Sequence, residues 1–423
     1  MVESPDADRI LVIRLGALGD VVRTIPAVAS LRAHYPGALI TWLVEPAAAS
    51  ALEGQAVVDE VMIFPRDRLQ AHLARLRPVS LLRQTLRFAR TLREGRFDLV
   101  VDFHGILKSG ILARLSGAPL RVGYAPPVGR EQSWRFANRR ALLSAGKRSR
   151  FERNEGLVRF LAVAPAAVFQ SRLRLEPEAA RRAEQQREQA VVVIHPGTSP
   201  ATPYKRYTAE GYAEAARLLY ERAGVRSLVS HGPAPGELEF AQRIVAASRG
   251  AAALAPDTPR FADLAELVAG ARVFIGSDSG PLHVASLLGT PVVQLLGPTD
   301  PVENAPFAGT PSRSVRVPVA CSPCRRGCAA ATCMRVIPSE AVAAAALELL
   351  QPKSFESDAA AGTDSAAGCE ISAREAGSGP PLHARAEPNR QPGDQAADRP
   401  SDRPTEPPTD RPTGSAAVRP AAH

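Results

Sequence analysis

The chain has 423 residues, of which 45% are hydrophobic and 5% aromatic, and its formal net charge is +9. This length and apolar content allow two globular domains with sizeable cores, and the positive charge favours an anionic partner. The scarcity of aromatic side chains, together with the lack of finger, homeodomain or RNP motifs, argues against a nucleic-acid-binding protein.

The N-terminus is acidic, and the apolar run that follows it, residues 10–15, is too short for the core of a signal peptide. The sequence contains no stretch of about 18 apolar residues, which argues against a membrane-spanning helix. We therefore expect a cytoplasmic protein that can also lie peripherally at the inner face of the cytoplasmic membrane.

The first part of the chain alternates short apolar runs with helical patterns. The run at 10–15 is continuous, as expected for a strand buried on both faces of a parallel sheet. Further strands are predicted at 39–45, 58–64 and 99–103, with helices at 21–34 and 66–96 and a basic, loop-like region at 116–153. This alternation predicts βαβ units and a parallel sheet.

A polar, charge-dense segment at 171–189 is predicted to link this part to a second α/β series. Strands are predicted at 191–195, 227–231, 273–276 and 291–296, with helices at 208–222, 238–247 and 261–269 between them. We therefore predict an N-terminal domain over 1–170 and a C-terminal domain over 190–337, with a ligand in the cleft between facing strand ends.

A last helix is predicted over 338–353, and the composition changes after it. Residues 354–423 are rich in Ala, Pro, Asp, Arg, Ser and Gly. Such a segment has too little apolar surface to offset the conformational entropy of the chain, so we predict a disordered tail.

The most informative segment, residues 274–300, predicts a strand, a tight Ser/Asp/Gly turn, a short helix and a second strand. Backbone N–H groups at such a helix N-terminus suit a diphosphate. The Ser279 hydroxyl and the backbone at Gly280 can contact that group. Asp278 can pair with a ligand hydroxyl or with Lys205, and His283 is either a packed helix residue or a ligand contact.

The loop after the first strand of the second series contains Thr198, Ser199 and Lys205. Hydroxyl groups and a lysine at the carboxyl end of a strand suit phosphate oxygens, and Lys205 can neutralise charge on a departing diphosphate. The alternative for Lys205 is a solvated loop lysine. Glu237, at the start of a later helix, either binds ribose hydroxyls or caps its helix.

Gly16 and Gly19 shape the loop after the first strand, and Asp20 opens the helix that follows. Asp20 is either an ordinary N-cap or, held ionised by the helix dipole, a general base facing the cleft. The loop lacks the third glycine of Gly-x-Gly-x-x-Gly. Because Glu45 ends the next strand where dinucleotide-binding proteins carry an acid, a nicotinamide dehydrogenase is a weaker alternative.

Four cysteines occur close together in a turn-rich segment: Cys321, Cys324, Cys328 and Cys333. Four thiolates can complete a structural zinc site, but the spacing is irregular for a zinc ribbon, and free thiols are the favoured interpretation. No Asp-x-Asp motif follows a strand, so we expect neither a metal-chelated diphosphate nor a metal cofactor.

Three ordered motifs together resemble glycosyltransferase family 9, which contains the ADP-heptose:lipopolysaccharide heptosyltransferases. They are Arg14-Leu-Gly-Ala-Leu-Gly-Asp20-Val, Pro196-Gly-Thr-Ser with Lys205, and Gly276-Ser-Asp-Ser-Gly-Pro-Leu-His283-Val-Ala continuing to Gly297-Pro-Thr-Asp300-Pro. The resemblance extends over about residues 9–350. It implies a GT-B fold, in which two Rossmann-like domains face each other across a cleft, with the acceptor on the N-terminal domain and the sugar nucleotide on the C-terminal domain.

The resemblance also implies an inverting, metal-independent transfer of heptose from ADP-heptose to the lipopolysaccharide inner core, without a cofactor. Asp20 matches the family's general base, Lys205 its phosphate- and sugar-contacting lysine, Asp278-Ser-Gly its donor-binding loop and Glu237 a nucleotide-contacting acid. The implied partners are a nucleotide-sugar donor and a lipid-linked saccharide at the inner-membrane surface, which some of the basic residues at 66–96 and 121–153 would meet.

Three other functions remain open. The enzyme could transfer a different sugar from another nucleotide, or it could be a GT-B-type nucleotide-sugar epimerase, which needs no acceptor. A catalytically silent sugar-nucleotide sensor would use the basic N-terminal half as a docking surface.

Overall fold

The computed structural model describes residues 6–144, 146–189, 191–324 and 327–351. Within these residues the chain forms two parallel sheets of six strands each. The first contains β1 (Arg9–Ile13), β2 (Leu39–Val44), β3 (Glu60–Ile63), β4 (Leu99–Asp102), β5 (Leu120–Tyr124) and β6 (Arg139–Ala141). The second contains β7 (Val192–His195), β8 (Ser227–Val229), β9 (Ala252–Leu254), β10 (Val273–Ser277), β11 (Val292–Leu295) and β12 (Ser312–Val315).

Both sheets have the strand order of a dinucleotide-binding fold. The first runs β3-β2-β1-β4-β5-β6 and the second runs β12-β11-β10-β7-β8-β9, which is the same order within its own half. In each sheet the order reverses direction once, between β1 and β4 and between β7 and β10. Ligands of such sheets bind outside the carboxyl ends of the strands at this point, so the topology places one candidate site in each half.

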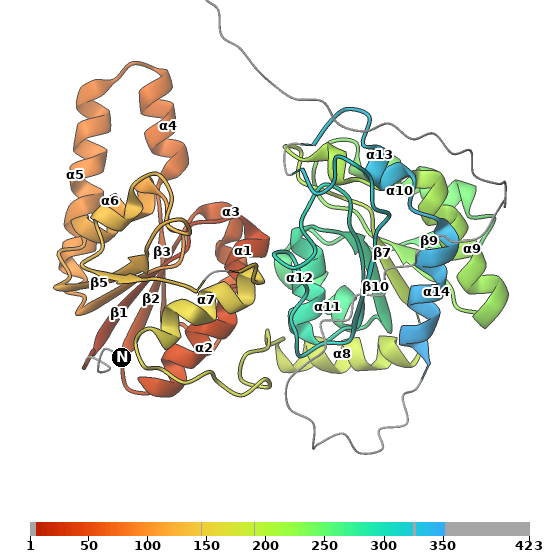
Figure 1. The fold of residues 1–423 in the computed structure, drawn as a ribbon, viewed down its shortest axis with the longest axis horizontal. Helices are drawn as coiled ribbons and strands as arrows, with labels where there is room; N and C mark the ends of the chain where they lie inside the picture. Colours follow the sequence, from red (N-terminus) through yellow and green to blue (C-terminus); the bar gives the residue numbers. More distant parts are fainter. Residues whose placement is uncertain (1–5, 145, 190, 325–326, 352–423) are drawn as a thin grey trace, which may run out of the picture. The chain divides into compact units, whose positions relative to one another are not determined.

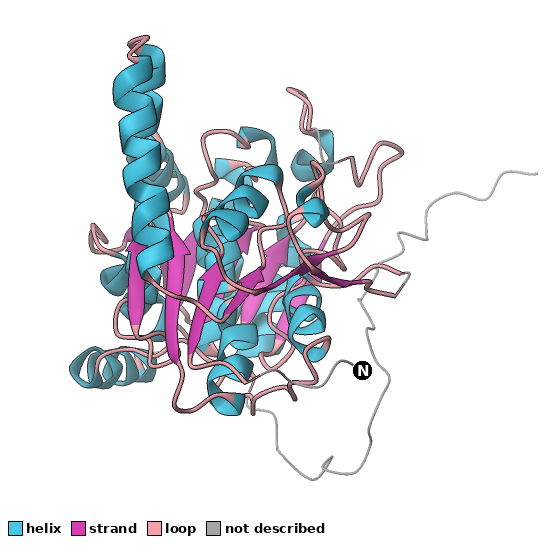
Figure 2. Ribbon diagram, turned by 90° about the vertical axis from the view of Figure 1, so that its left-hand side faces the viewer, coloured by secondary structure: helices cyan, strands magenta, loops and turns pink. Residues whose placement is uncertain are grey.

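Helices cover both faces of the sheets, as Figures 1 and 2 show. Those of the first half are α1 (Leu18–Val22), α2 (Ile25–His34), α3 (Pro46–Ala49), α4 (Arg66–Ala74), α5 (Pro78–Glu94), α6 (Leu107–Leu115) and α7 (Arg150–Arg159), with 3₁₀ turns at Ser50–Leu52 and Ser133–Arg135. Those that follow are α8 (Pro177–Glu188), a 3₁₀ turn at Pro203–Lys205, α9 (Ala209–Ala223), α10 (Glu237–Ala247), α11 (Phe261–Ala269), α12 (Gly280–Leu288), α13 (Thr332–Arg335) and α14 (Ser339–Leu350).

The apolar strands bury side chains on both faces, which explains their continuous hydrophobic runs. In β1, Ile10 and Val12 belong to one core and Leu11 and Ile13 to the core on the other face of the sheet. The second sheet is likewise packed between two cores. Val284 of α12 is part of the core that contains Ile10, so apolar contacts join the second half to the first.

Proline divides two segments that the sequence predicts as single helices. The helix predicted at 21–34 is two helices, α1 and α2, and Pro26 lies in the first turn of α2, where its missing N–H costs nothing. The region at 66–96 is likewise divided into α4 and α5, because Pro78 opens α5 and the residue before a proline is disfavoured in helical conformation.

The segment 171–189, predicted to link the two series, contains the helix α8. Ala179 and Ala183 of α8 are buried, and its exposed face carries the charges that make the sequence look like a connection. The Arg182 guanidinium donates two hydrogen bonds of 2.6 Å to Glu266 of α11, which fastens α8 to the second half. Strands β9 and β12 were also not predicted, since both are short edge strands.

None of the helices within the described residues combines the length and the apolar character that crossing a bilayer requires. The tail predicted at 354–423 lies outside the described residues, as do residues 352–353 of the predicted last helix.

Candidate active site

In each sheet, the loops that the sequence singles out follow the two strands between which the strand order reverses. In the first half, β1 leads into the loop with Gly16 and Gly19, and β4 ends beside His104. In the second half, β7 leads into the loop with Thr198 and Lys205, and β10 ends in the turn at Asp278 and Ser279. The candidate residues therefore lie at the carboxyl ends of four strands, where ligands of such sheets bind.

The loops of the two halves meet where α1 approaches α12. A Cβ atom placed on Gly19 would lie 3.0 Å from the Cα atom of Gly280, closer than packed atoms normally approach. Gly280 is the first residue of α12, so glycine at position 19 lets the backbone that carries Asp20 touch the N-terminus of this helix. Of the two loop glycines, Gly16 lies elsewhere, beside the Glu45 carboxylate.

This contact leads to a prediction for Gly19→Ala. The added methyl group must displace α12 by a few tenths of an ångström, and we expect turnover to fall roughly three- to tenfold because the two reacting loops separate. Gly37→Ala is the matched control, because a Cβ there would meet nothing within 4 Å. Steady-state kinetics and thermal denaturation of both variants test this, and equal kcat values for the two variants would contradict it.

Asp20 lies at the centre of an arginine cluster. Its carboxylate pairs with Arg14, with Arg23 at 3.1 Å and with Arg150 at 2.8 Å. Burial by itself would raise the pKa of Asp20, but the charges of these arginines outweigh burial and hold the pKa well below its ordinary value. Burial also lowers the pKa of Arg23 to about 10, which leaves its guanidinium charged at neutral pH. Asp20 is therefore a carboxylate throughout the physiological range.

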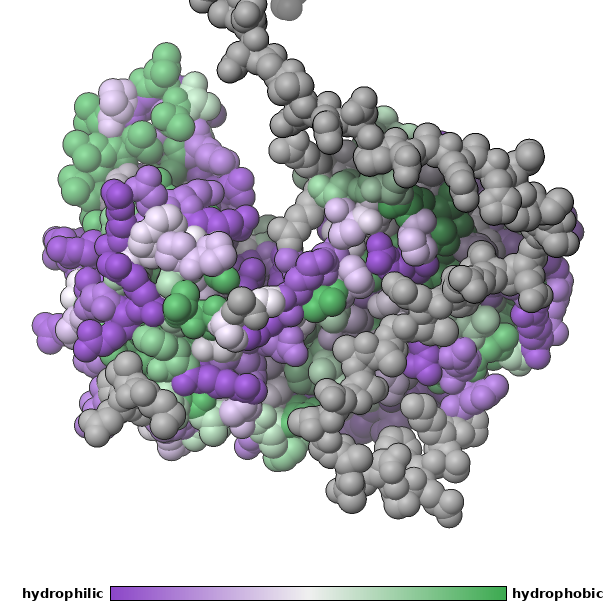
Figure 3. Space-filling view, viewed as in Figure 1, coloured by the Kyte–Doolittle hydropathy of each residue, from purple (hydrophilic) through white to green (hydrophobic). Residues whose placement is uncertain are grey.

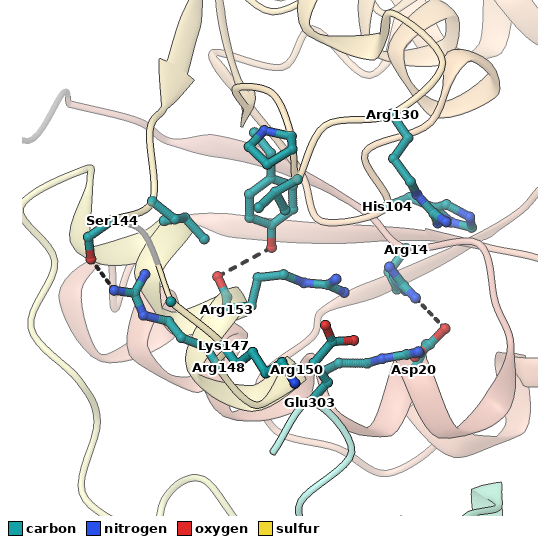
Figure 4. Close-up of a pocket in the computed structure, with 15 residues that line it drawn as sticks. Arg14, Asp20, His104, Arg130, Ser144, Lys147, Arg148, Arg150, Arg153 and Glu303 are labelled. Carbon is teal, nitrogen blue, oxygen red and sulfur yellow. Dashed lines mark hydrogen bonds and ion pairs between the residues drawn. The ribbon is translucent and has the colours of Figure 1, made fainter. Parts of the chain in front are cut away.

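A cavity of about 390 Å³ opens beside this cluster (Figure 4). Its charged lining is mainly basic, with Arg14, Arg130, Lys147, Arg148, Arg150 and Arg153 against Asp20 and Glu303. His104 also lines it. The Nδ1 atom of His104 accepts a hydrogen bond of 3.2 Å from the Leu15 N–H, and burial, assisted by the charge of Arg14, lowers the pKa of His104 to about 3. The neutral imidazole thus keeps its proton on Nε2, available to an acceptor atom.

On the donor side, Lys205 pairs with Asp278, one of the two partners that the sequence suggests for it. The Lys205 Nζ atom lies 2.9 Å from Asp278 Oδ2, and His283 Nε2 lies 3.2 Å from Asp278 Oδ1. Burial opposes ionisation of Asp278, yet hydrogen bonding to His283 and the charge of Lys205 hold its pKa below the ordinary value. His283 is fully buried, and that burial lowers its pKa to about 4, so it is a packed, neutral helix residue.

Two donor-side hydroxyl groups have no partner among the described residues. Thr198 Oγ1 and Ser279 Oγ are both shielded from solvent without a hydrogen bond. An unpaired buried hydroxyl is costly, which is consistent with a bound ligand as its partner. Ser199, in contrast, is exposed, and its Oγ accepts only a long hydrogen bond of 3.4 Å from Ala201 within its own loop.

The two candidate glutamates both have protein partners. Glu237 is buried, and its Oε2 accepts a hydrogen bond of 2.7 Å from the Gly232 N–H, close to Gly197 of the phosphate-loop candidate. Glu45 pairs with Lys108 at 2.7 Å and with Arg66 at 2.8 Å. Burial alone would raise the pKa of Glu45, but the hydrogen bonds from Lys108 and Arg66 lower it. Glu45 therefore serves as a structural counter-ion for these two cations. This pairing removes the feature that suggested a dehydrogenase.

Several residues that complete the site have no role that their sequence pattern indicates. Lys147 Nζ lies 2.6 Å from Asp300 Oδ2, and the Arg150 N–H donates to the Glu303 carbonyl at 3.1 Å. These contacts join the basic segment near 150 to the Gly-Pro-Thr-Asp loop of the second half. The motif at 297–300 and the density of basic residues at 121–153 were both visible in the sequence, but only folding shows that they meet.

The four cysteines are free thiols: Cys333 is buried, Cys324 is partly exposed, and Cys321 and Cys328 are exposed. Burial, and then the three other cysteines, raise the pKa of Cys333. Within the described ranges no group of three or more His, Cys, Asp or Glu side chains is arranged to hold a metal ion.

Known proteins resemble this chain in sequence and in fold. The model of the family described as Glycosyltransferase family 9 (heptosyltransferase) matches residues 85–334. Lipopolysaccharide heptosyltransferase 1 of Pseudomonas aeruginosa is 30% identical over 327 residues, which cover 75% of this chain and 86% of that protein. Lipopolysaccharide core heptosyltransferase OpsX of Haemophilus influenzae is 25% identical over 302 residues, covering 70% and 81%.

Among solved structures, the Escherichia coli heptosyltransferase WaaC with ADP superimposes with a TM-score of 0.64 at 22% identity, covering 81% of this chain and 99% of that one. This likeness supports the GT-B fold that two facing parallel sheets of this order predict. The family match, extending over more than half of the chain, decides the class of protein. The chain belongs to glycosyltransferase family 9 and is a glycosyltransferase.

Proposed function

We propose that this enzyme transfers a heptose from ADP-heptose to a sugar of the lipopolysaccharide inner core, with inversion at the anomeric carbon and without a metal. The observation that carries the proposal is the contact between Gly19 and Gly280. Arg23 pairs with Asp20 at 3.1 Å, and its charge also acts on Asp278 of the other half, which pairs with Lys205. The similar proteins named above are heptosyltransferases of lipopolysaccharide, which supports the choice of sugar and acceptor.

The reaction assigned to these residues is a single displacement. Asp20 accepts the proton of an acceptor hydroxyl as its oxygen forms a bond to the anomeric carbon. The bond from that carbon to the diphosphate oxygen breaks on the opposite face, and ADP leaves with the bonding electrons. Lys205 and the backbone N–H groups at the start of α12 stabilise the charge on the leaving diphosphate. Thr198 and Ser279 supply hydroxyl groups to its oxygens.

The basic cavity beside Asp20 is suited to an acidic saccharide acceptor, whose carboxylate or phosphate groups would draw the arginines away from Asp20. Three cations stabilise the carboxylate so strongly in the free protein that it is a weak base. If an anionic acceptor takes over Arg150, whose side chain is one-third exposed, the basicity of Asp20 rises when the acceptor binds. Binding of the correct acceptor would thereby activate the base.

On acidification, kcat and kcat/KM are expected to decline at different pH values. Because a lowered pKa keeps Asp20 ionised until the pH falls through that pKa, kcat/KM should not decline through protonation of Asp20 between about pH 5 and pH 8. The decline in kcat, which reports the enzyme with substrate bound, should begin at a higher pH. Arg150→Gln removes one cation and should raise the pH at which kcat/KM begins to decline on acidification. An unchanged pH of decline would contradict the role of Asp20 as the base.

The function itself is tested by product analysis. The protein is incubated with ADP-heptose and a core saccharide acceptor, and mass spectrometry should reveal an acceptor one heptose heavier, with NMR showing the inverted anomeric configuration. Incubation with the donor alone tests the alternative of an epimerase, which would convert the sugar without an acceptor. Lipopolysaccharide from a strain that lacks the protein should in turn lack one core sugar, and an unchanged core would refute the proposal.

A further inference from the structure

The helical hairpin formed by α4 and α5 stands out from the first half with little packing of its own (Figures 1 and 2). No residue of α4 is buried, and only Ala89 and Leu92 are buried in the 17 residues of α5. A helix pair that the fold needed only as a connection would be shorter, and solvated helices without a partner surface are normally polar.

This hairpin is not polar at its tip. Five large apolar side chains are exposed there or on the first turns of α5: Leu73, Leu76, Val79, Leu82 and Leu86. Leu76 is 86% exposed and Val79 is 70% exposed. Val79, Leu82 and Leu86 follow each other at helical spacings of three and four residues and thus form one stripe along α5. Figure 3 shows apolar residues gathered on the hairpin at its upper left.

Arginines flank the apolar stripe. Between residues 66 and 96 the sequence contains nine arginines but only two acids, Asp67 and Glu94. Arg83 and Arg87 are exposed and lie one residue after Leu82 and Leu86, hence about 100° further around the helix. An apolar stripe bordered by guanidinium groups is the arrangement found in helices that lie in the interface of an anionic bilayer, with apolar side chains below the headgroups and cations at the phosphates.

The position of the hairpin places this stripe at the edge of the sheet that carries the candidate active site. α4 begins just after the carboxyl end of β3, the same edge at which β1 leads to Asp20 and β4 to His104. α5 then returns toward the amino end of β4. Its 17 residues extend over about 25 Å, roughly twice the length of the four-residue β4, so its first turns project beyond that edge.

We propose that residues 73–87 of this hairpin dock the enzyme on an anionic phospholipid bilayer, with the leucine and valine side chains inserted at the headgroup boundary. The inference rests on the proposed function, because a lipid-linked acceptor would then reach the basic cavity from the surface on which the enzyme is docked. A second copy of the hairpin is a poorer partner, since a symmetric contact between two copies would bring arginine-rich surfaces together.

The first test measures binding of the full chain to vesicles of equal parts phosphatidylethanolamine and phosphatidylglycerol, by flotation. The double variant Leu76→Glu/Leu82→Glu should bind at least about tenfold more weakly, because both side chains are exposed and their loss removes inserted apolar surface. The matched control is Phe169→Glu/Leu238→Glu, which replaces two exposed apolar residues outside the hairpin and should bind as wild type does. Equal binding by the two double variants would overturn the proposal.

The second test separates the charges from the apolar stripe. Arg83→Ala/Arg87→Ala should weaken binding to these vesicles by roughly tenfold, and the effect should diminish at high salt. Arg181→Ala/Arg243→Ala removes two arginines on the other half of the chain and should change little. Binding of the wild type to pure phosphatidylcholine vesicles as strong as to anionic vesicles would contradict the role of charge.

A transfer assay distinguishes failure of this proposal from failure of the proposed function. Leu76→Glu/Leu82→Glu should retain wild-type turnover on a delipidated core saccharide and lose most activity on acceptor embedded in vesicles. A wild type that binds vesicles but transfers no heptose would refute the function and leave the docking surface standing. Sedimentation analysis completes the test: if the leucine substitutions dissociate a dimer without weakening vesicle binding, the stripe is a contact between copies and the docking proposal is wrong.

Discussion

Asp20→Asn should lower kcat by roughly 10²–10⁴-fold while leaving the affinity for ADP near that of the wild type. The amide cannot accept the proton of the acceptor hydroxyl, whereas the proposed donor contacts, Lys205 and the start of α12, belong to the second half. Steady-state kinetics with saturating donor and acceptor give kcat, and calorimetry with ADP gives the affinity. A folded Asp20→Asn variant with near-normal kcat would exclude Asp20 as the base.

Asp20 also neutralises three arginines, so its removal has a structural consequence that must be separated from the chemical one. Arg14 and Arg23 are almost completely buried and would remain as uncompensated charges. Asp20→Glu keeps the negative charge but displaces the carboxylate, and should preserve the melting temperature better than it preserves kcat. Asp59→Asn removes the partner of Arg32 elsewhere in the first half and controls for the loss of an ion pair.

Lys205→Ala should weaken the binding of ADP by roughly 10–100-fold and lower kcat as well. A hydrogen bond between charged groups contributes about 1.5–3 kcal/mol, and Lys205 would make its contact with the diphosphate in both the bound and the departing state. The substitution also leaves the buried carboxylate of Asp278 facing the diphosphate without the ammonium group that now lies 2.9 Å away.

Lys108→Ala provides the matched control for this experiment. Lys108 is a partly exposed lysine that pairs with Glu45 on the first half, and its loss should leave ADP binding unchanged. Isothermal calorimetry of both variants with ADP measures the difference directly. If Lys205→Ala binds ADP as tightly as Lys108→Ala does, Lys205 is a solvated loop lysine rather than a ligand for the diphosphate.

Features that depend on local patterns can be predicted from the amino-acid sequence. Continuous apolar runs such as Ile10–Leu15 identify strands buried on both faces, and they alternate with helical patterns in two series, which is enough to infer two parallel sheets. The loop motifs around Asp20, Lys205 and Asp278 occur at the ends of these strands, and they were sufficient to recognise the family, which the comparison with its model confirms.

Local patterns were misleading where a residue has two compatible roles. Pro26 and Pro78 weaken the helical pattern around them, yet each begins a second helix instead of interrupting the first. The polar segment at 171–189 gives no sign of the helix α8, because α8 exposes most of its surface. In these cases the outcome depends on which neighbouring element buries the few apolar side chains.

The residues that surround the candidate base, and those that lie at the surface, become known only from the folded chain. Arg150 is 130 positions from Asp20, and nothing in either segment indicates that they form an ion pair. Pairing of this kind depends on how α7 folds back against the first helices of the same half, which α7 contacts through α2. In the same way, the leucines of the α4–α5 hairpin have the spacing of a core-facing helix, and only the fold shows that no core lies against them, because burial is a property of neighbours that are distant in sequence.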